Sequence, residues 1–156
     1  MLLIEEPDGS LLITLASTRE ELRFALNAAL KYAAKANAAQ ATVTVVLREL
    51  LLNAMEHGNK AVAHRLIRCR LQRSQELGLV ISVQDEGEGF DYHAIDLTIP
   101  ENPHGLEHRG LKLVSALTDQ MKFNDRGNAI TTLISHSRSA VSTSPRSDAE
   151  AMGGVP

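Results

Sequence analysis

Two stretches of the sequence carry side chains whose types and spacing could support chemistry. In the first, Glu49 and Asn53 are four residues apart, and Glu56 and His57 follow one helical turn later. On a helix these side chains would share one stripe, with neighbouring Cβ atoms about 5–6 Å apart. A carboxylate placed there could accept a proton from a hydroxyl group, and an amide oxygen could ligate a hard cation such as Mg²⁺.

The second stretch runs from Leu79 to Asp91 and changes character halfway. Apolar and β-branched residues fill its first half, and Asp85 then leads into Gly87 and Gly89. Glycine adopts positive φ without strain and lets the backbone approach a ligand closely. We therefore expect Asp85 at the end of a strand, next to a turn that can receive a ligand. Taken alone, the pattern also fits an ordinary tight turn after a strand.

The first stretch must form a helix for its polar side chains to converge. Between Thr42 and Gly58, apolar residues recur at intervals of three and four: Val43, Leu47, Leu50, Leu51 and Ala54. This period is typical of a helix with one buried face. Gly58 and Asn59 are typical of a helix C-terminus. The sequence therefore predicts a helix over residues 42–58, with the polar stripe away from the core.

The rest of the chain supplies the elements that position these stretches. Ser17 or Thr18 can cap a helix that runs to about Ala36, and a further helix is expected from Arg109 to about Asp119. Alternating patterns predict strands at residues 10–15, 64–73, 79–84, 121–123 and 129–135. Residues 2–5 either form a short partner strand or fray. This order predicts one layer of helices on a sheet, a two-layer α/β sandwich.

Two segments show no periodic pattern. Prolines and a glycine interrupt the chain between Tyr92 and Arg109, and an irregular segment of this length usually forms a lid or a binding loop. After His136 the sequence is rich in Ser, Ala, Pro and Gly. The apolar content of 44% is ample for one core, so we expect one domain over residues 1–136 and a disordered tail over residues 137–156.

Composition narrows the classes of function. A net charge of −3 gives no general electrostatic case for nucleic acid, and two Tyr, three Phe and no Trp leave few side chains to stack on bases. No segment approaches the ~20 apolar residues of a membrane span, and no signal peptide is visible, so we expect a cytoplasmic protein. The single cysteine, Cys69, excludes an internal disulfide, and its alternating neighbours predict a buried thiol.

Together the motifs resemble those of the GHKL ATPase superfamily, whose members have the Bergerat-type ATP-binding fold. Residues 49–58, ELLLNAMEHG, look like its N box; residues 85–91, DEGEGFD, look like its first glycine box; and residues 109–113, RGLKL, look like a degenerate second one. The chain is most similar to small anti-sigma-factor serine kinases of bacterial partner-switching systems, over about residues 10–136. The implied fold has three helices covering one face of a mixed, mostly antiparallel sheet.

The resemblance also implies roles for individual residues. The family residue that matches Asp85 accepts a hydrogen bond from the adenine amino group, and Gly87 and Gly89 would give the base and ribose room. The residue that matches Asn53 ligates Mg²⁺. The triphosphate would lie at the start of the third helix, where a helix N-terminus favours phosphate. The residues expected to bind it are His108, Arg109, Gly110, Leu111 and Lys112. A solvent-exposed histidine of the lid is the alternative for His108.

The implied reaction is phosphorylation by ATP and Mg²⁺ of a serine on an anti-sigma-factor antagonist of the STAS type. In the similar kinases the residue that matches Glu49 is the base, and an arginine of the first helix faces the phosphates, with Arg23 as the best match. A solvated face on which Arg23 lies near Glu20 is the alternative for this arginine. The resemblance further implies binding of a sigma factor and a homodimer, with no direct contact to nucleic acid or membrane.

One departure from the family keeps a second function open. Members commonly have a glycine two positions before Gly110, where this chain has His108. The alternative is therefore a regulatory module that binds ATP or ADP to control partner binding and transfers phosphate weakly or not at all. A histidine-kinase catalytic domain acting in trans is disfavoured, because the chain lacks a phosphoacceptor helix pair. We interpret His57 as a packing or hydrogen-bonding residue.

Overall fold

The structure, a computed structural model, describes residues 1–36, 38–97 and 108–136. Its elements in chain order are β1 (Leu2–Glu5), β2 (Leu11–Ala16), α1 (Arg19–Ala33), α2 (Gln40–Asn53), a π-helical turn (Ala54–Gly58), β3 (Leu66–Ser74), β4 (Gly78–Asp85), a 3₁₀ turn (Tyr92–Ala94), α3 (Arg109–Leu117), β5 (Gln120–Phe123) and β6 (Ala129–Ile134). The predicted tail and most of the predicted lid lie outside the described residues.

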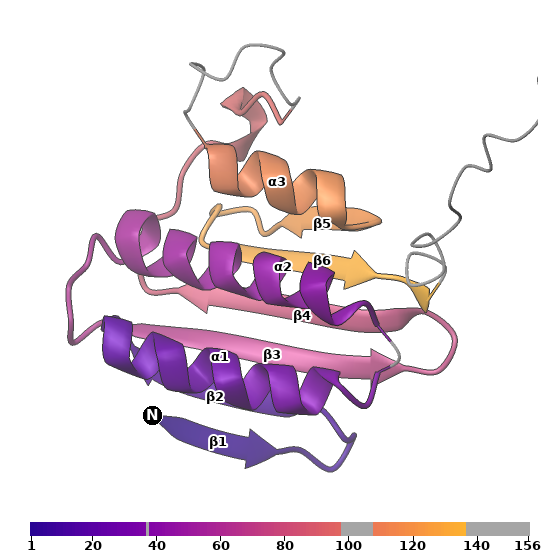
Figure 1. The fold of residues 1–156 in the computed structure, drawn as a ribbon. Helices are drawn as coiled ribbons and strands as arrows, with labels where there is room; N and C mark the ends of the chain where they lie inside the picture. The colour runs from indigo at the N-terminus through magenta and orange to yellow at the C-terminus, as the bar shows by residue number, and fades with distance from the viewer. Residues whose placement is uncertain (37, 98–107, 137–156) are drawn as a thin grey trace, which may run out of the picture.

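The described strands form one sheet in the order β1-β2-β3-β4-β6-β5. Every neighbouring pair is antiparallel, so the predicted mixed character is absent from this part of the chain. The helices cover one face of the sheet (Figure 1). This arrangement is the predicted two-layer α/β sandwich. α3 lies beside α2 in the helical layer.

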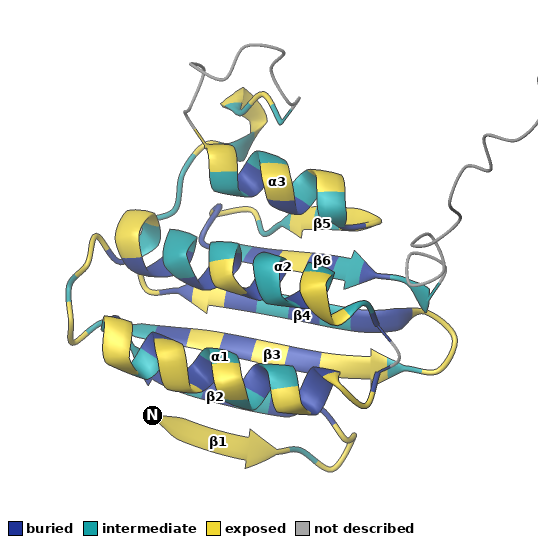
Figure 2. Ribbon diagram, in the orientation of Figure 1, coloured by how far each residue is buried: buried dark blue, intermediate teal, exposed yellow. Residues whose placement is uncertain are grey.

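The core lies between the helices and the sheet (Figure 2). On β3, the buried residues Ile67, Cys69 and Leu71 alternate with exposed arginines, because successive side chains of a strand point to opposite faces. The apolar face predicted for α2 is buried throughout: Val43, Leu47, Leu50, Leu51 and Ala54. Burial of a leucine-sized side chain contributes about 1.5–3 kcal/mol. Complete burial also raises the pKa of the Cys69 thiol to about 12, which keeps it protonated.

The predicted cap of α1 is confirmed, whereas the ends of α2 differ in detail from the prediction. Thr18 caps α1 by accepting a hydrogen bond from the Glu21 N–H at 3.3 Å. α2 begins at Gln40, and its last turn widens into a π-helical turn in which the Asn59 N–H donates to the Ala54 carbonyl at 2.8 Å. This wide turn brings the end of the helix against β4.

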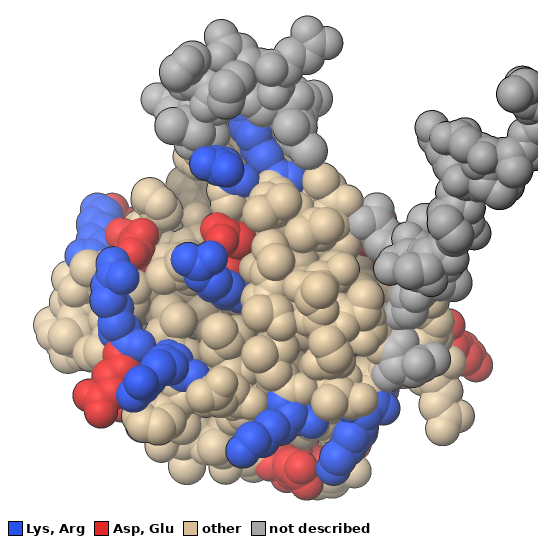
Figure 3. Space-filling model, in the orientation of Figure 1, with Lys and Arg blue, Asp and Glu red and all other residues tan. Residues whose placement is uncertain are grey.

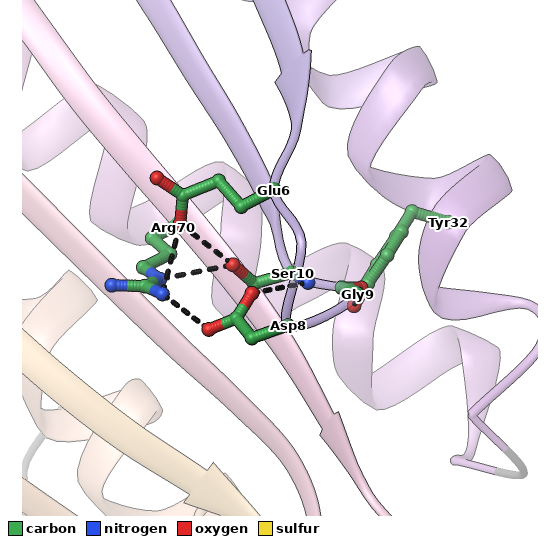
Figure 4. A network of polar contacts seen from close by, with 6 residues as sticks. All are labelled: Glu6, Asp8, Gly9, Ser10, Tyr32 and Arg70. Carbon is green, nitrogen blue, oxygen red and sulfur yellow. Dashed lines mark hydrogen bonds and ion pairs between the residues drawn. The ribbon is translucent and has the colours of Figure 1, made fainter.

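The turn between β1 and β2 is held by a polar network to β3 and α1 (Figure 4). A guanidinium nitrogen of Arg70 lies 2.8 Å from Glu6 and 2.7 Å from Asp8. Tyr32 of α1 donates its hydroxyl to the Gly9 carbonyl at 2.6 Å. The first strand therefore pairs with β2 instead of fraying, although all four of its residues are exposed.

The surface over the helices carries charges of both signs, interspersed with uncharged side chains (Figure 3). No single-sign patch dominates the described part of this face, in keeping with the formal charge of −3. Within the described ranges, no helix has both the length and the apolar character that a membrane span requires.

Candidate functional site

Two adjoining cavities open between α2, the turn after β4 and the start of α3. The larger has a volume of about 590 Å³, and its described lining is Glu49, Leu52, Asn53, Glu56, His57, His108, Arg109, Gly110 and Leu111. The smaller, of about 330 Å³, is lined among others by Asp85, Glu88, Gly89, Phe90, Ala94 and Ile95. Of the residues that the structure describes, four line both cavities: Asn53, His57, His108 and Leu111. The cavities are therefore two compartments of one site.

The polar stripe of α2 converges on this site as the spacing predicted. Glu49, Asn53, Glu56 and His57 all line the larger compartment. Their convergence follows from the opposite face of α2, which is buried against the sheet. Asn53 lies at the boundary of the two compartments, and the Glu49 side chain remains 24% exposed. A carboxylate and a carboxamide thus line the same compartment.

Asp85 ends β4, as predicted, and points its carboxylate into a nearly closed environment. The residue is 7% exposed, and its Oδ1 accepts a hydrogen bond from the Gly87 N–H at 2.8 Å. Burial raises the pKa of the Asp85 carboxyl above its ordinary value, and the Gly87 N–H acts in the opposite direction. The smaller compartment therefore contains a buried hydrogen-bond acceptor.

The glycines around Asp85 permit close backbone contacts, and Gly89 also has the predicted positive φ. A Cβ on Gly87 would overlap the carbonyl oxygen of Gly58, and a Cβ on Gly58 would overlap the Asp85 carboxylate. Gly89 has a φ of +81°, and a Cβ there would overlap the carbonyl of Arg126. Gly89 lines the smaller compartment, whereas Gly87 is outside its described lining. These glycines chiefly permit close backbone contacts that fix Asp85.

The start of α3 forms the opposite wall of the larger compartment. A Cβ on Gly110 would lie 2.6 Å from Glu49 Oε2, so this helix terminus and the α2 carboxylate are in close contact. His108 precedes the helix in the left-handed conformation, with a φ of +56°. Arg109 and Leu111 also line the compartment. Lys112 is outside the described lining, since it lies further along α3.

The two arginines of α1 are placed differently. Arg23, predicted to face the phosphates, is exposed and outside the described lining; its guanidinium lies 5.3 Å from the ring centroid of Phe24. Arg19, one turn earlier, lies 3.3 Å from Glu56 at the edge of the larger compartment. The structure thus brings Arg19, not Arg23, beside the site.

The apolar wall of the smaller compartment was not singled out from the sequence. Phe90 and Ile95 form part of it. The Phe90 and Phe123 rings meet edge to face at 5.7 Å, and Tyr92 stacks on Phe123 at 4.9 Å. Because residues after Asp91 show no periodic pattern, only the aromatic residues beside the second glycine could have indicated this wall.

The residues present suit a nucleotide and a hard cation. Among the described residues there is no group of three or more His, Cys, Asp or Glu side chains that could hold a metal ion. Mg²⁺ needs no such group, because it is commonly held by one or two protein oxygens, waters and substrate phosphates. The Asn53 amide oxygen at the boundary of the compartments has this chemistry.

Comparison with known proteins places the chain in a family. The profile of the histidine kinase-like ATPase domain matches residues 12–134. Among solved structures, the chain is similar to the crystal structure of the RsbU and RsbW domains of Rv1364c from Mycobacterium tuberculosis, with 19% identity and a TM-score of 0.47; the match covers 81% of this chain and 32% of that one. No curated protein matches. The chain belongs to the family of histidine kinase-like ATPase domains, which implies that it binds ATP.

Proposed function

We propose that this protein is a Mg²⁺-dependent protein-serine kinase and anti-sigma factor of a bacterial partner-switching system. Its substrate would be a serine on an anti-sigma-factor antagonist of the STAS type. The observation that carries the proposal is the convergence of Glu49, Asn53 and Asp85, which are distant in sequence, on two adjoining compartments.

The smaller compartment suits adenine. Its apolar wall of Phe90 and Ile95 can pack against a flat base, and the Asp85 carboxylate can accept a hydrogen bond from the amino group. A buried acceptor that matches an amino group discriminates strongly against bases that lack one, because the acceptor would then stay unpaired.

The larger compartment suits the triphosphate and the cation. The N-terminus of α3 at Gly110 presents backbone N–H groups, and Arg109 adds positive charge. The amide oxygen of Asn53 would hold Mg²⁺, which supplies charge neutralisation for phosphoryl transfer. Every one of these groups reaches the space that Glu49 also lines.

Glu49 is the group that would accept the proton of the serine hydroxyl. Its side chain is 24% exposed, so a hydroxyl from a second protein can approach it. It lies one helical turn before Asn53 on the same face of α2. Phosphoryl transfer depends mainly on positioning and charge, so a placed base and cation suffice without a covalent intermediate.

The second candidate is a module that binds nucleotide without transferring phosphate. The histidine at position 108, in place of the glycine common in the family, favours it. The backbone φ of His108, +56°, helps to decide between the module and the kinase. Glycine adopts the left-handed region without strain, whereas another residue incurs a cost of about 1–2 kcal/mol. The backbone at His108 therefore keeps the conformation that a glycine would allow. This geometry supports the kinase, because a glycine at this position could take the same backbone conformation.

The test is transfer of label from γ-labelled ATP to candidate antagonist proteins. Glu49→Gln should reduce transfer about 10²- to 10⁴-fold, the range typical of a general base, with ATP affinity nearly unchanged by calorimetry. Glu76→Gln, the same substitution in the distant β3–β4 turn, should transfer normally. Undiminished transfer by Glu49→Gln would contradict the proposed base. ATP binding without transfer to any antagonist would leave the nucleotide-binding module.

A further inference from the structure

We infer that Asn59 is a positioning residue for base selection: its buried side chain holds the turn that carries Asp85 and thereby sets a preference for adenine. The inference rests on the proposed nucleotide site and extends it to a residue outside the described lining of both compartments. Asn59 follows the π-helical turn at the end of α2.

The Asn59 side chain uses its donors and its acceptor in three hydrogen bonds. It is 0% exposed. Nδ2 donates to Ser17 Oγ at 2.7 Å and to the Leu66 carbonyl at 2.9 Å, and Oδ1 accepts from the Glu86 N–H at 2.8 Å. An exchanged amide would place its NH₂ group against the Glu86 N–H, so only one orientation satisfies all three partners.

These bonds join the neighbouring ends of three strands, β2, β3 and β4. Ser17 follows β2, Leu66 begins β3 and Glu86 follows β4. The registers place these ends together, since Ala16 pairs with Leu66 and Ile67 pairs with Asp85. Asn59 therefore links the π-helical turn at the end of α2 directly to the peptide unit that follows Asp85.

Close contacts hold the turn after Asp85, and the hydrogen bond from the Glu86 N–H to Asn59 holds it as well. The Gly58 and Gly87 backbones are in contact, and the Asp85 carboxylate lies against Gly58. On the other side, the Asp85 N–H and carbonyl each bond to Asn128 at 3.0 Å. The Gly87 N–H holds the carboxylate directly, and the backbone that carries it is held by Asn128 on one side and by Asn59, through Glu86, on the other. A shift of about 1 Å at such a site can cost orders of magnitude in function.

The preference of the protein for one base over another depends on the position of Asp85 and not on the contacts with the phosphates. Adenine offers an amino donor to a carboxylate, whereas hypoxanthine has a carbonyl oxygen at the same place, which the carboxylate repels. ATP and ITP have identical triphosphates. The ratio of their dissociation constants therefore isolates the contact of Asp85 with the base.

The experiment measures ATP and ITP affinities by calorimetry for wild type and three variants. Wild type should bind ATP at least about tenfold more tightly than ITP, as expected for a hydrogen bond to a charged group. Asn59→Ala should lose most of this ratio through weaker ATP binding. Ser17→Ala removes a bond of the same network but leaves the bond to Glu86, so the ratio should persist. Asn59→Asp keeps the acceptor for the Glu86 N–H but places an oxygen against the Leu66 carbonyl, so it should keep the ratio and lose stability.

The outcomes separate this inference from the proposed function. A ratio retained in Asn59→Ala overturns the role of Asn59 alone. A wild-type chain that binds ATP and ITP equally overturns the adenine site and the inference together. If Asn59→Ala does not fold, hydrogen exchange in wild type decides the question. There, saturating ATP should slow exchange of the Glu86 amide more than saturating ITP, and equal slowing would overturn the inference.

Discussion

Asp85 has two properties that oppose each other in the nucleotide-free protein. The proposed hydrogen bond from adenine is strongest to an ionised carboxylate, yet burial raises the pKa of this group above the ordinary 3.8. Burial therefore disfavours the charge on which this hydrogen bond relies. Such a cost in stability is common where a buried group is needed for binding.

Asp85→Asn should consequently leave the nucleotide-free protein as stable as wild type, or more stable, at neutral pH. Because the folded pKa is raised, the stabilising contribution of Asp85 is present below pH 3.8 and is lost as pH rises through the folded value. The advantage of the variant should thus grow from acid to neutral pH. Urea unfolding at several pH values measures it. A variant that is less stable than wild type at neutral pH and gains on acidification would contradict this reading.

The placement of a single side chain could be predicted where the period of its helix or strand determines the face on which it lies. Glu49 and Asn53 converge because four residues make about one helical turn, and Asp85 ends a strand because an apolar run stops there. The role of Asn59 could not be predicted, because its partners Ser17 and Glu86 are distant in the sequence. The contact of Arg23 with the phosphates stays a prediction, and the position of Arg23 outside the described lining does not favour it.

The contact between the π-helical turn and the turn after β4 holds the two motifs together. The helix over this region was predicted, but its wide last turn was not, since π-helices are rare and have no strong sequence pattern. The contact depends on glycine at both positions. Gly87 and Gly58 meet backbone to backbone, with no space for a side chain.

Gly87→Ala should therefore weaken ATP binding as well as stability. The added methyl group must push apart the helix end and the Asp85 turn, and such overpacking costs about 1–3 kcal/mol. Gly9→Ala is the matched control: its φ of +77° makes alanine strained, but nothing lies within 4 Å of the new Cβ. Both variants should lose stability in urea unfolding, and only Gly87→Ala should lose ATP affinity. Equal ATP affinities in the two variants would show that the contact does not position the site.

The architecture of the whole molecule could be predicted better from the order of its strands and helices than from any single motif. Alternating strands and amphipathic helices predicted the two-layer sandwich, and the family match over residues 12–134 agrees with it. The purely antiparallel pairing was not predictable, because sequence order alone does not say that β6 lies between β4 and β5. The pairing of β1 was equally undecided, since an exposed apolar strand has no buried face to fix it.

The central claim is that Asp85, Asn53 and Glu49 surround one magnesium nucleotide, and titration calorimetry of ATP with Mg²⁺ tests it most directly. Wild type should bind one ATP per chain, and Asp85→Asn should bind at least about tenfold more weakly, because a hydrogen bond to a charged group contributes about 1.5–3 kcal/mol. Equal affinity in the two proteins, or no binding by wild type, would contradict the account.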